Sequence, residues 1–401
     1  MTTKSKPTYP VPMLDLKRQY EPLQKELLEA VGHVLQTQHF ILGEPVTQFE
    51  QAAAAQLGVK HAIGCASGTD ALWLALAAAG IGQGFGPENP AASGHQPCMT
   101  VVTTPFSFFA SVSSIFRAGA RPLLADIDPA TFNLSPTAVQ SILNGPQGER
   151  VKAALPVHLY GQCADFPPDF GKEHGMTMIE DAAQAWGAER NGINAGGIGA
   201  AAAFSFYPTK NLSAAGDAGM VSTNDDEIAE RARMLRQHGM RRRYYHDEMG
   251  WNARMDGFQG AVLAVKLKHI AHWNDARRTA AANYDALFRA AGLAESSPYP
   301  ANGIVLPHEA PGNKHVWHQY VIRTARRDEL RAFLAERNIG SEVYYPVPLH
   351  LQEPLKPLGY REGDFPEAER AAREVLALPI FAEIRPDEQQ TVVNAIAEFF
   401  S

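Results

Sequence analysis

The 401-residue sequence has little cysteine and lacks any long apolar run. Its three cysteines, Cys65, Cys98 and Cys163, form no closely spaced pair, so the sequence predicts neither a disulfide framework nor a zinc site. No stretch approaches about 18 continuous apolar residues, and the segment MTTKSKPTYPVPMLDL has no apolar centre typical of a signal peptide. We therefore expect a cytoplasmic protein with reduced cysteines and no membrane partner.

The sequence also lacks an excess of positive charge, since its formal net charge is −7. Basic residues are spread along the chain, apart from the run Arg241, Arg242 and Arg243. We interpret this run as a solvated loop, with contact to a substrate diphosphate as the alternative. Nucleic acid is not an expected partner. The 45% hydrophobic composition excludes global disorder.

The order of apolar patterns predicts an α/β protein with two domains. From about residue 59 to 223, short apolar runs alternate with helical patterns, which predicts a mostly parallel sheet. Residues 257–291 carry apolar side chains at helical spacing without proline, which predicts one long helix. A smaller α+β pattern follows and ends in an amphipathic helix. We predict a large domain over residues 1–265 and a small domain over residues 266–401, with residues 82–97 as an exposed Gly/Pro-rich loop.

One lysine stands out because its surroundings are uncharged. Lys210 follows the apolar run from Ala200 to Phe206, which predicts a buried strand, and Pro208 turns the chain after that strand. A desolvated lysine loses its proton more easily and can attack a carbonyl group. Most lysines that follow a strand are simply solvated, so this residue alone decides nothing.

A carboxylate is expected at a neighbouring strand end. Asp181 ends the run MTMIED, at the carboxyl edge where open α/β sheets bind ligands. A lysine and an acid there fit pyridoxal phosphate, which needs an amine to hold its aldehyde and an acid beside its pyridine nitrogen. Gln184, one helical turn on, is placed to reach the cofactor's hydroxyl side. The alternative for Asp181 is a helix N-cap.

A phosphate site is predicted in CASGTDALWLALAAAG. Ser67, Gly68, Thr69 and Asp70 join a strand to an alanine-rich helix, whose free backbone amides and positive end attract anions. Ser205, near the end of the lysine's strand, adds a hydroxyl. The same residue types are also ordinary N-caps that need no ligand.

Taken together, the motifs resemble the DegT/DnrJ family of nucleotide-sugar aminotransferases, within the fold type I pyridoxal phosphate enzymes. The resemblance covers nearly the whole chain and includes FILGEPVTQFE, SGTDAL, TTPFSFFAS, PVHLYGQ, IEDAAQAWGA, FSFYPTKNL and YYPVPLHLQ. It implies a large domain with a mostly parallel sheet, a small α+β domain and pyridoxal 5'-phosphate as cofactor.

The resemblance also implies roles for single residues around the cofactor. Lys210 would be the Schiff-base lysine, with Asp181 on the pyridine nitrogen and Gln184 beside it. Thr69, Asp70 and Ser205 would hold the phosphate, next to Ser67 and Gly68. Phe108 would stack on the pyridine ring, although core packing is its alternative. Asn252 would reach the phosphate of the partner subunit, which implies a homodimer with shared active sites.

The implied substrates are an amino-acid donor, with L-glutamate expected, and a nucleotide-linked keto-sugar. His318, Tyr345 and His350 would lie near the sugar. Gln184 and the segment PVHLYGQ resemble family members that act at sugar position 3. Trp186 and the long 82–97 loop depart from the family pattern and leave the sugar's identity open.

Other interpretations remain open. A sugar dehydratase would use the same cofactor, although the retained Lys210 favours transamination. A silent regulatory or scaffolding protein can keep the fold without the activity. His315 and His318 lie three residues apart, but the alternating pattern VWHQYVI predicts a strand that directs its residues to both faces, so we expect no metal there.

Overall fold

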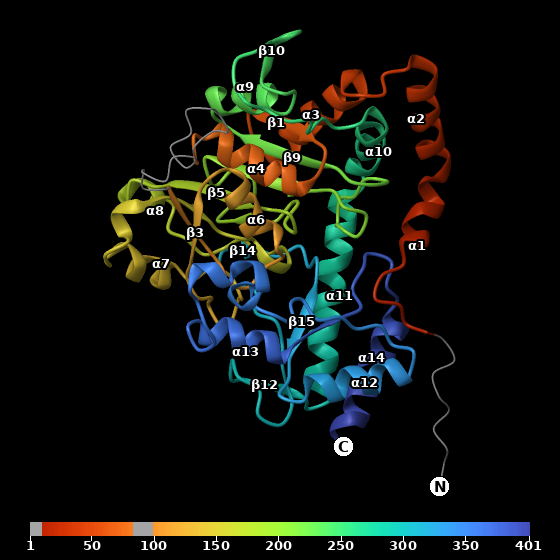
Figure 1. Cartoon of the computed structure of the whole chain (residues 1–401). Coiled ribbons are helices and arrows are strands. Elements are labelled where there is room, and N and C mark those ends of the chain that lie inside the picture. Colours follow the sequence, from red (N-terminus) through yellow and green to blue (C-terminus); the bar gives the residue numbers. More distant parts are fainter. Residues whose placement is uncertain (1–9, 83–98) are drawn as a thin grey trace.

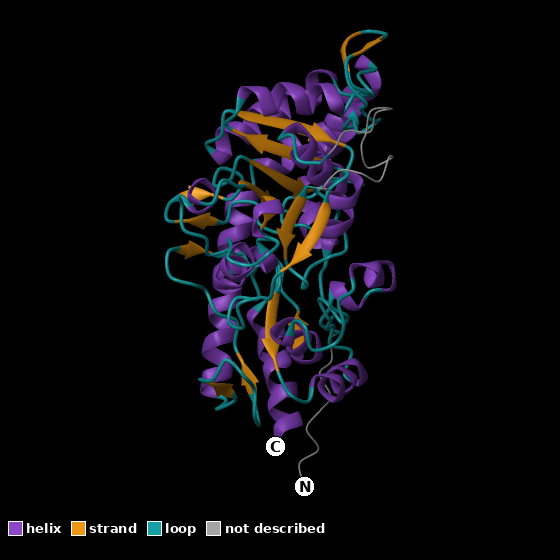
Figure 2. Cartoon of the chain, turned by 60° about the vertical axis from the view of Figure 1, so that its left-hand side comes forward, coloured by secondary structure: helices purple, strands orange, loops and turns teal. Residues whose placement is uncertain are grey.

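The computed structural model of the chain describes residues 10–82 and 99–401 (Figure 1). Cys98 and nearly all of the predicted 82–97 loop lie outside the described residues. The described part forms a larger body around a seven-stranded sheet and a smaller body around a four-stranded sheet (Figures 1 and 2). No helix in residues 10–82 and 99–401 combines the length and apolar character needed to cross a bilayer.

The central sheet has the strand order β1–β9–β8–β5–β4–β2–β3. Among the described strands of this sheet only β9 runs against the others, which confirms the predicted mostly parallel arrangement. The strands are β1 (His61–Cys65), β2 (Thr100–Thr103), β3 (Arg121–Leu124), β4 (Val151–Leu155), β5 (Thr177–Asp181), β8 (Ala201–Ser205) and β9 (Gly219–Thr223). The chain segments that follow β1, β2, β5 and β8 therefore emerge at one edge of the sheet.

Helices cover both faces of this sheet (Figure 2). Helix α4 (Gly68–Ala78) is apolar nearly all round, and seven of its eleven residues are buried because it packs between the sheet and the neighbouring helices. The other helices that the structure describes in the larger body are α2 (Gln24–Thr37), α3 (Gly43–Leu57), α6 (Ala110–Arg117), α7 (Pro136–Leu143), α8 (Phe170–Glu173), α9 (Asp226–Leu235) and α10 (Gly257–Leu267).

The prediction of one uninterrupted helix over residues 257–291 is wrong. Two helices occupy it, α10 and α11 (Ile270–Ala290). Between them, the backbone N–H groups of Lys268 and His269 donate to the carbonyls three residues earlier, so the regular four-residue ladder stops. Helix α10 packs on α2 and α3 of the larger body, whereas α11 extends to the smaller body and contacts α14 (Pro386–Phe400).

The smaller body has the strand order β12–β13–β15–β16. Its strands and helices are β12 (Ala294–Glu295), β13 (Ile304–Val305), β15 (Tyr320–Arg323), β16 (Val375–Leu378), α12 (Arg327–Glu336), α13 (Pro366–Glu374) and α14. Val392, Val393 and Ile396 of α14 are buried, as the amphipathic pattern predicts. Strand β15 begins at Tyr320, so the prediction that His315 and His318 lie on a strand is wrong, and both belong to the preceding loop.

Short strand pairs complete the described structure. They are β6 (Glu189–Arg190) with β7 (Ile193–Asn194) and β14 (Asn313–Lys314), and the hairpin of β10 (Met240–Arg242) and β11 (Tyr245–His246). In this hairpin Arg241 pairs with Glu230 and Asp247, and all three side chains are exposed, as expected for a solvated arginine run.

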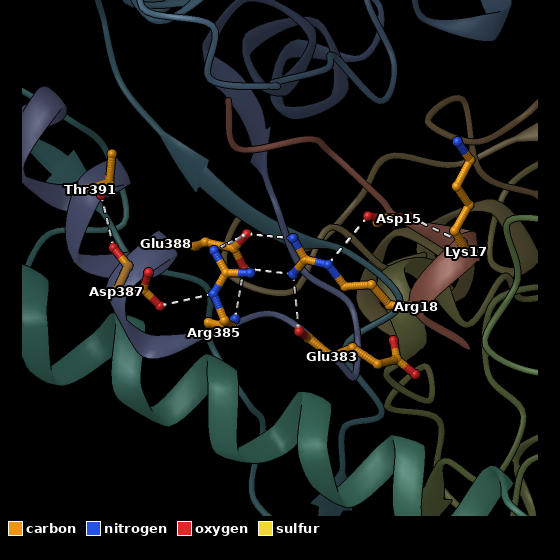
Figure 3. A network of polar contacts seen from close by, with 8 residues as sticks. All are labelled: Asp15, Lys17, Arg18, Glu383, Arg385, Asp387, Glu388 and Thr391. Atoms are coloured by element: carbon orange, nitrogen blue, oxygen red, sulfur yellow. Dashed lines mark hydrogen bonds and ion pairs between the residues drawn. The ribbon is translucent and has the colours of Figure 1, made fainter. Parts of the chain in front are cut away.

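The first described residues of the chain contact its C-terminal part. Val11 pairs with Ile339, and α1 (Leu16–Tyr20) carries Arg18, whose guanidinium contacts the Glu388 carboxylate at 2.6 Å (Figure 3). Glu388 also accepts from the Arg385 backbone N–H at the start of α14, so one carboxylate joins both segments. The domain boundary between residues 265 and 266 remains a prediction.

Candidate active site

A cavity of about 580 Å³ opens at the edge of the central sheet where β1, β2, β5 and β8 end. It brings together ten of the site residues predicted from the sequence. They are Ser67, Gly68, Thr69, Phe108, Asp181, Gln184, Ser205, Lys210, His318 and Tyr345. The residues predicted to meet at the strand ends therefore line one cavity.

Lys210 enters this cavity from the turn that follows β8. Its backbone N–H donates to the Tyr207 carbonyl at 2.8 Å, which closes the turn around Pro208. Burial lowers the pKa of the Lys210 ammonium to about 8, and the nearby Asp181 carboxylate opposes this shift. A larger part of this lysine is therefore neutral near physiological pH than for a solvated lysine, although the ammonium form still predominates.

Asp181 is the last residue of β5, and its carboxylate is almost fully buried. Ser111 Oγ donates to Asp181 Oδ2 at 2.7 Å, and the Ala183 backbone N–H donates to Oδ1 at 3.2 Å. Burial raises the pKa of Asp181, while these two donors and Lys210 work against that shift. The hydrogen bonds fix the orientation of a carboxylate at the cavity wall.

Sequence reasoning missed Ser111, which sits four residues after Ser107. Their hydroxyl oxygens lie 2.8 Å apart, so Ser107 supports the serine that orients Asp181. Ser107 lies in the loop before α6 and Ser111 in its first turn, so the sequence gives no regular spacing that would have paired them.

The N-terminus of α4 forms a narrow turn beside Ser205. Ser67 caps the helix by accepting from the Asp70 backbone N–H at 3.1 Å. A Cβ atom placed on Gly68 would lie 2.5 Å from Ser205 Cβ, so only glycine allows this close approach. The positive end of the helix, the Ser205 hydroxyl and Thr69 thus meet in a cradle suited to a phosphate group.

Asp70 does not line the cavity, although the sequence comparison placed it on the phosphate. Its carboxylate accepts from Ser67 Oγ at 2.9 Å and from Arg117 at 2.5 Å. Each helix position turns the side chain by about 100° relative to its neighbour, which directs Asp70 away from the opening that Thr69 faces. Its role in the structure is therefore to brace the turn.

Gln184 and Tyr345 lie together at the cavity wall. Gln184 Oε1 accepts from the Tyr160 backbone N–H at 2.6 Å, and its Nε2 donates to the Tyr345 hydroxyl at 3.2 Å. Burial and the Asp181 carboxylate raise the pKa of the Tyr345 hydroxyl, so it remains protonated. The Phe108 ring lies 6.3 Å from the Tyr345 ring and is 60% exposed, which leaves its face open to a ligand.

His350 and Trp186 lie elsewhere in the protein. His350 is buried with its Nε2 3.0 Å from Glu369 Oε1 in the smaller body, and it does not line the cavity. The expectation that it approaches the sugar therefore finds no support in this geometry. Trp186 donates to Gln56 at 3.2 Å and packs against Phe204 in the core, so its departure from the family pattern changes packing rather than the cavity wall.

Asn252 also lies outside this cavity. It is exposed, and its backbone pairs with Gln237 next to the β10–β11 hairpin. An outward position is what a residue needs if it serves a second subunit, but its role remains a prediction. Within the described residues no group of three or more His, Cys, Asp or Glu side chains is arranged to hold a metal ion.

Comparison of the sequence and the structure with known proteins shows the family of this chain. The model of the DegT/DnrJ/EryC1/StrS aminotransferase family matches residues 21–397. The chain belongs to this family. The structure superposes on a crystal structure of DesV from S. venezuelae with a TM-score of 0.88, 40% sequence identity and coverage of 98% of this chain and 99% of that chain.

Relatives in sequence carry two kinds of name. A dTDP-3-amino-3,4,6-trideoxy-alpha-D-glucose transaminase of Streptomyces venezuelae is 40% identical, covering 97% of this chain and 96% of the relative. A protein of Geobacillus stearothermophilus named pleiotropic regulatory protein is 47% identical, covering 97% and 98%. Together with the family match, these similarities identify the chain as a nucleotide-sugar aminotransferase of the pyridoxal phosphate-dependent fold type I class.

Proposed function

We propose that this enzyme transfers an amino group from L-glutamate to a nucleotide-linked keto-sugar. The observation that carries the proposal is the meeting of an amine and an oriented carboxylate, Lys210 and Asp181, in one cavity beside the helix N-terminus of α4. A lone reactive lysine or a lone anion site would not suggest this chemistry. Their combination fits a cofactor that bears both an aldehyde and a phosphate.

The residues fit pyridoxal phosphate on three counts. Glycine at position 68 lets the N-terminus of α4 approach Ser205 closely, so the free backbone amides of the helix and the Ser205 hydroxyl face the same cavity. The Lys210 amine is partly neutral, and Asp181 has its carboxylate fixed by Ser111. When bound, pyridoxal phosphate supplies an electron-accepting ring that stabilises the carbanion left when an amino acid loses its α-proton.

The residues that line the cavity would have separate roles in the reaction. Asp181 would keep the pyridine nitrogen of a bound cofactor protonated, and the hydrogen bond from Ser111 holds its carboxylate in place. Lys210 would hold the cofactor's aldehyde through its amine and, as a free amine, would accept and return a proton at Nζ beside the donor's α-carbon. Gln184 and the Tyr345 hydroxyl form a hydrogen-bonded part of the cavity wall, next to the Phe108 ring.

We infer position 3 of the sugar as the site of amination. The name of the S. venezuelae relative refers to a 3-amino sugar, and Gln184 and the PVHLYGQ segment resemble enzymes of that group. A purely regulatory role, suggested by the name of the Geobacillus relative, gives no reason to keep Lys210 and Asp181 together in an open cavity.

A half-reaction assay tests the proposal. The cofactor-loaded enzyme is first mixed with L-glutamate alone, and the loss of its absorbance band is followed. A panel of 3-keto and 4-keto nucleotide sugars is then added, and return of the band with a 3-keto sugar is the expected result. A sugar dehydratase would eliminate a hydroxyl group without net transfer of the amine to the sugar, and a silent protein would not respond to glutamate at all. Return of the band only with 4-keto sugars would contradict position 3.

We further propose a homodimer in which Asn252 reaches the phosphate held by the other subunit. Each closed two-fold arrangement would contain two such shared sites. The test mixes an inactive Lys210→Ala chain with an Asn252→Ala chain that has first been shown to be severely impaired. Some mixed dimers then carry one site with both residues intact, so activity should return. No recovery after demonstrated subunit exchange would mean that Asn252 does not act across subunits.

A further inference from the structure

His318 lies where two cavities meet. It lines the candidate active-site cavity and also a neighbouring cavity of about 690 Å³, which Met13, Lys17 and Glu342 border on its far side. Thr209, Gln319 and Tyr344 line both cavities as well. A substrate that extends beyond the group reacting at Lys210 would pass this junction.

A chain of two side-chain amides stands behind the His318 ring. Asn274 Nδ2 donates to the Trp186 carbonyl at 2.9 Å, which turns Asn274 Oδ1 toward Asn211. Asn211 Nδ2 donates both to this Oδ1 and to the Val316 carbonyl, each at 2.9 Å. The two backbone carbonyls accept only, so they fix the orientation of both amides.

The fixed amides determine which nitrogen of His318 carries hydrogen. Asn211 Oδ1 is the remaining polar atom of that side chain, and it lies 3.2 Å from His318 Nδ1. Because Oδ1 can only accept, Nδ1 must be the donor. The other nitrogen, Nε2, has no hydrogen-bond partner among the residues that the structure describes, and it belongs to a ring that borders both cavities.

We infer that Asn211 and Asn274 hold His318 as the Nδ1–H tautomer, so that Nε2 offers a bare lone pair at the cavity junction to a hydroxyl group of the sugar substrate. His318 is then a specificity-determining residue, and the two asparagines are positioning residues. The nature of the hydroxyl donor rests on the proposed function, whereas the tautomer does not. Burial and the charges of Lys210 and Arg277, with His315 nearby, keep the pKa of His318 well below its usual value, so a second proton is disfavoured.

His315 provides an internal contrast only three residues away. Its Nδ1 accepts from the Trp317 backbone N–H at 2.9 Å, so its hydrogen must sit on Nε2. Burial lowers the pKa of His315 to about 3, which also keeps it neutral. The two neighbouring histidines are therefore expected in opposite tautomers, and each serves as the reference for the other.

Neutron diffraction from a deuterium-exchanged crystal of the cofactor-loaded enzyme near pH 7 tests the tautomer directly. The expected map has a deuteron on Nδ1 of His318 and on Nε2 of His315. A deuteron on Nε2 of His318, or on both of its nitrogens, would overturn the inference. This result does not depend on whether any sugar has been identified as a substrate.

Kinetics of two His318 variants test the acceptor role. His318→Asn keeps a donor for Asn211 but removes the Nε2 position, and loss of one hydrogen bond should lower kcat/KM for the keto-sugar by about tenfold. His318→Gln can place an amide oxygen near the Nε2 position and should lose less. Equal losses in both variants, or a loss as large in the glutamate half-reaction, would contradict a contact with the sugar.

A pair of variants on one helix tests the positioning role. Asn274→Ala breaks the amide chain behind His318, whereas Asn283→Ala removes a similar bond of α11, the one to Gln389 Oε1 at 2.8 Å, away from the cavity. We expect Asn274→Ala to raise the KM for the keto-sugar by about threefold to tenfold and Asn283→Ala to leave it unchanged. The same KM in both variants would show that the amide chain does not position His318. If no sugar reacts with the wild-type enzyme, the proposed function fails, and the neutron map still decides the tautomer.

Discussion

Lys210 and Lys266 are both lysines whose pKa burial lowers to about 8, yet their surroundings differ. Lys266 lies in α10 and donates to Ser213 Oγ at 2.7 Å within the packed interior. Lys210 lines a cavity of about 580 Å³ and has Asp181 as a charged neighbour. Both amines thus lose their protons more easily than a solvated lysine does, but of the two only Lys210 lines this cavity. Burial lowers the pKa of both lysines, so burial alone does not distinguish them. The cavity beside Lys210, with Asp181 in its wall, is what allows this lysine to react with a ligand.

Replacing each lysine should separate the two positions most strongly. Lys210→Ala removes the amine that the chemistry requires and should lower kcat by at least about 10⁴-fold. Lys266→Met removes the interior amine and should keep kcat within about threefold, since a core substitution of similar volume is tolerated. Steady-state rates of both variants, each checked for folding by circular dichroism, give the measurement. A comparable loss in both would erase the distinction.

Asp181 sharpens the comparison because its carboxylate lines the cavity. The carboxylate near Lys266, that of Glu383, does not line that cavity. Asp181→Asn keeps the shape and the bond from Ser111 but removes the charge, so kcat should fall by about 100-fold or more. The exposed carboxylate of Asp226, paired with Lys60 on the surface, provides the control Asp226→Asn. A rate for Asp181→Asn within about threefold of wild type would show that this carboxylate does not hold the cofactor nitrogen.

The smallest expected effect concerns stability and its pH dependence. The folded-state pKa of Lys266 lies below the unfolded value, so the unfolded chain binds more protons between about pH 8 and pH 10.5 and stability rises with pH through that window. Lys266→Met should therefore stabilise the protein by about 1–3 kcal/mol at pH 7, and this gain should shrink as the pH approaches 10.5. Urea unfolding at pH 7 and pH 10 measures it, with exposed Lys268→Met as control. A gain that does not change with pH would contradict a buried amine.

The sequence predicts which residues lie at the carboxyl edge of the sheet better than it predicts the direction and partners of their side chains. Parallel strands end at one edge, so recognising the strands before Gly68, Asp181 and Lys210 is enough to bring these residues together. That inference needs no side-chain coordinates, and the cavity confirms that they meet.

What the sequence does not reveal depends on side-chain direction and on distant partners. Asp70 turns toward Arg117, and His350 turns toward Glu369, although both stand in motifs that suggest a ligand. Ser111 supports Asp181 across 70 positions of the chain, which no local pattern encodes. The break after Leu267 likewise follows from the different bodies that α10 and α11 contact rather than from a proline or glycine.

Borohydride reduction of the cofactor-loaded protein followed by peptide mapping tests the central distinction most directly. Reduction fixes the cofactor permanently to the amine that holds it, and every lysine in the chain competes in the same sample. The account predicts a pyridoxyl label on the peptide that contains Lys210 and none on the peptide that contains Lys266. A label on Lys266, or on any lysine other than Lys210, would contradict it.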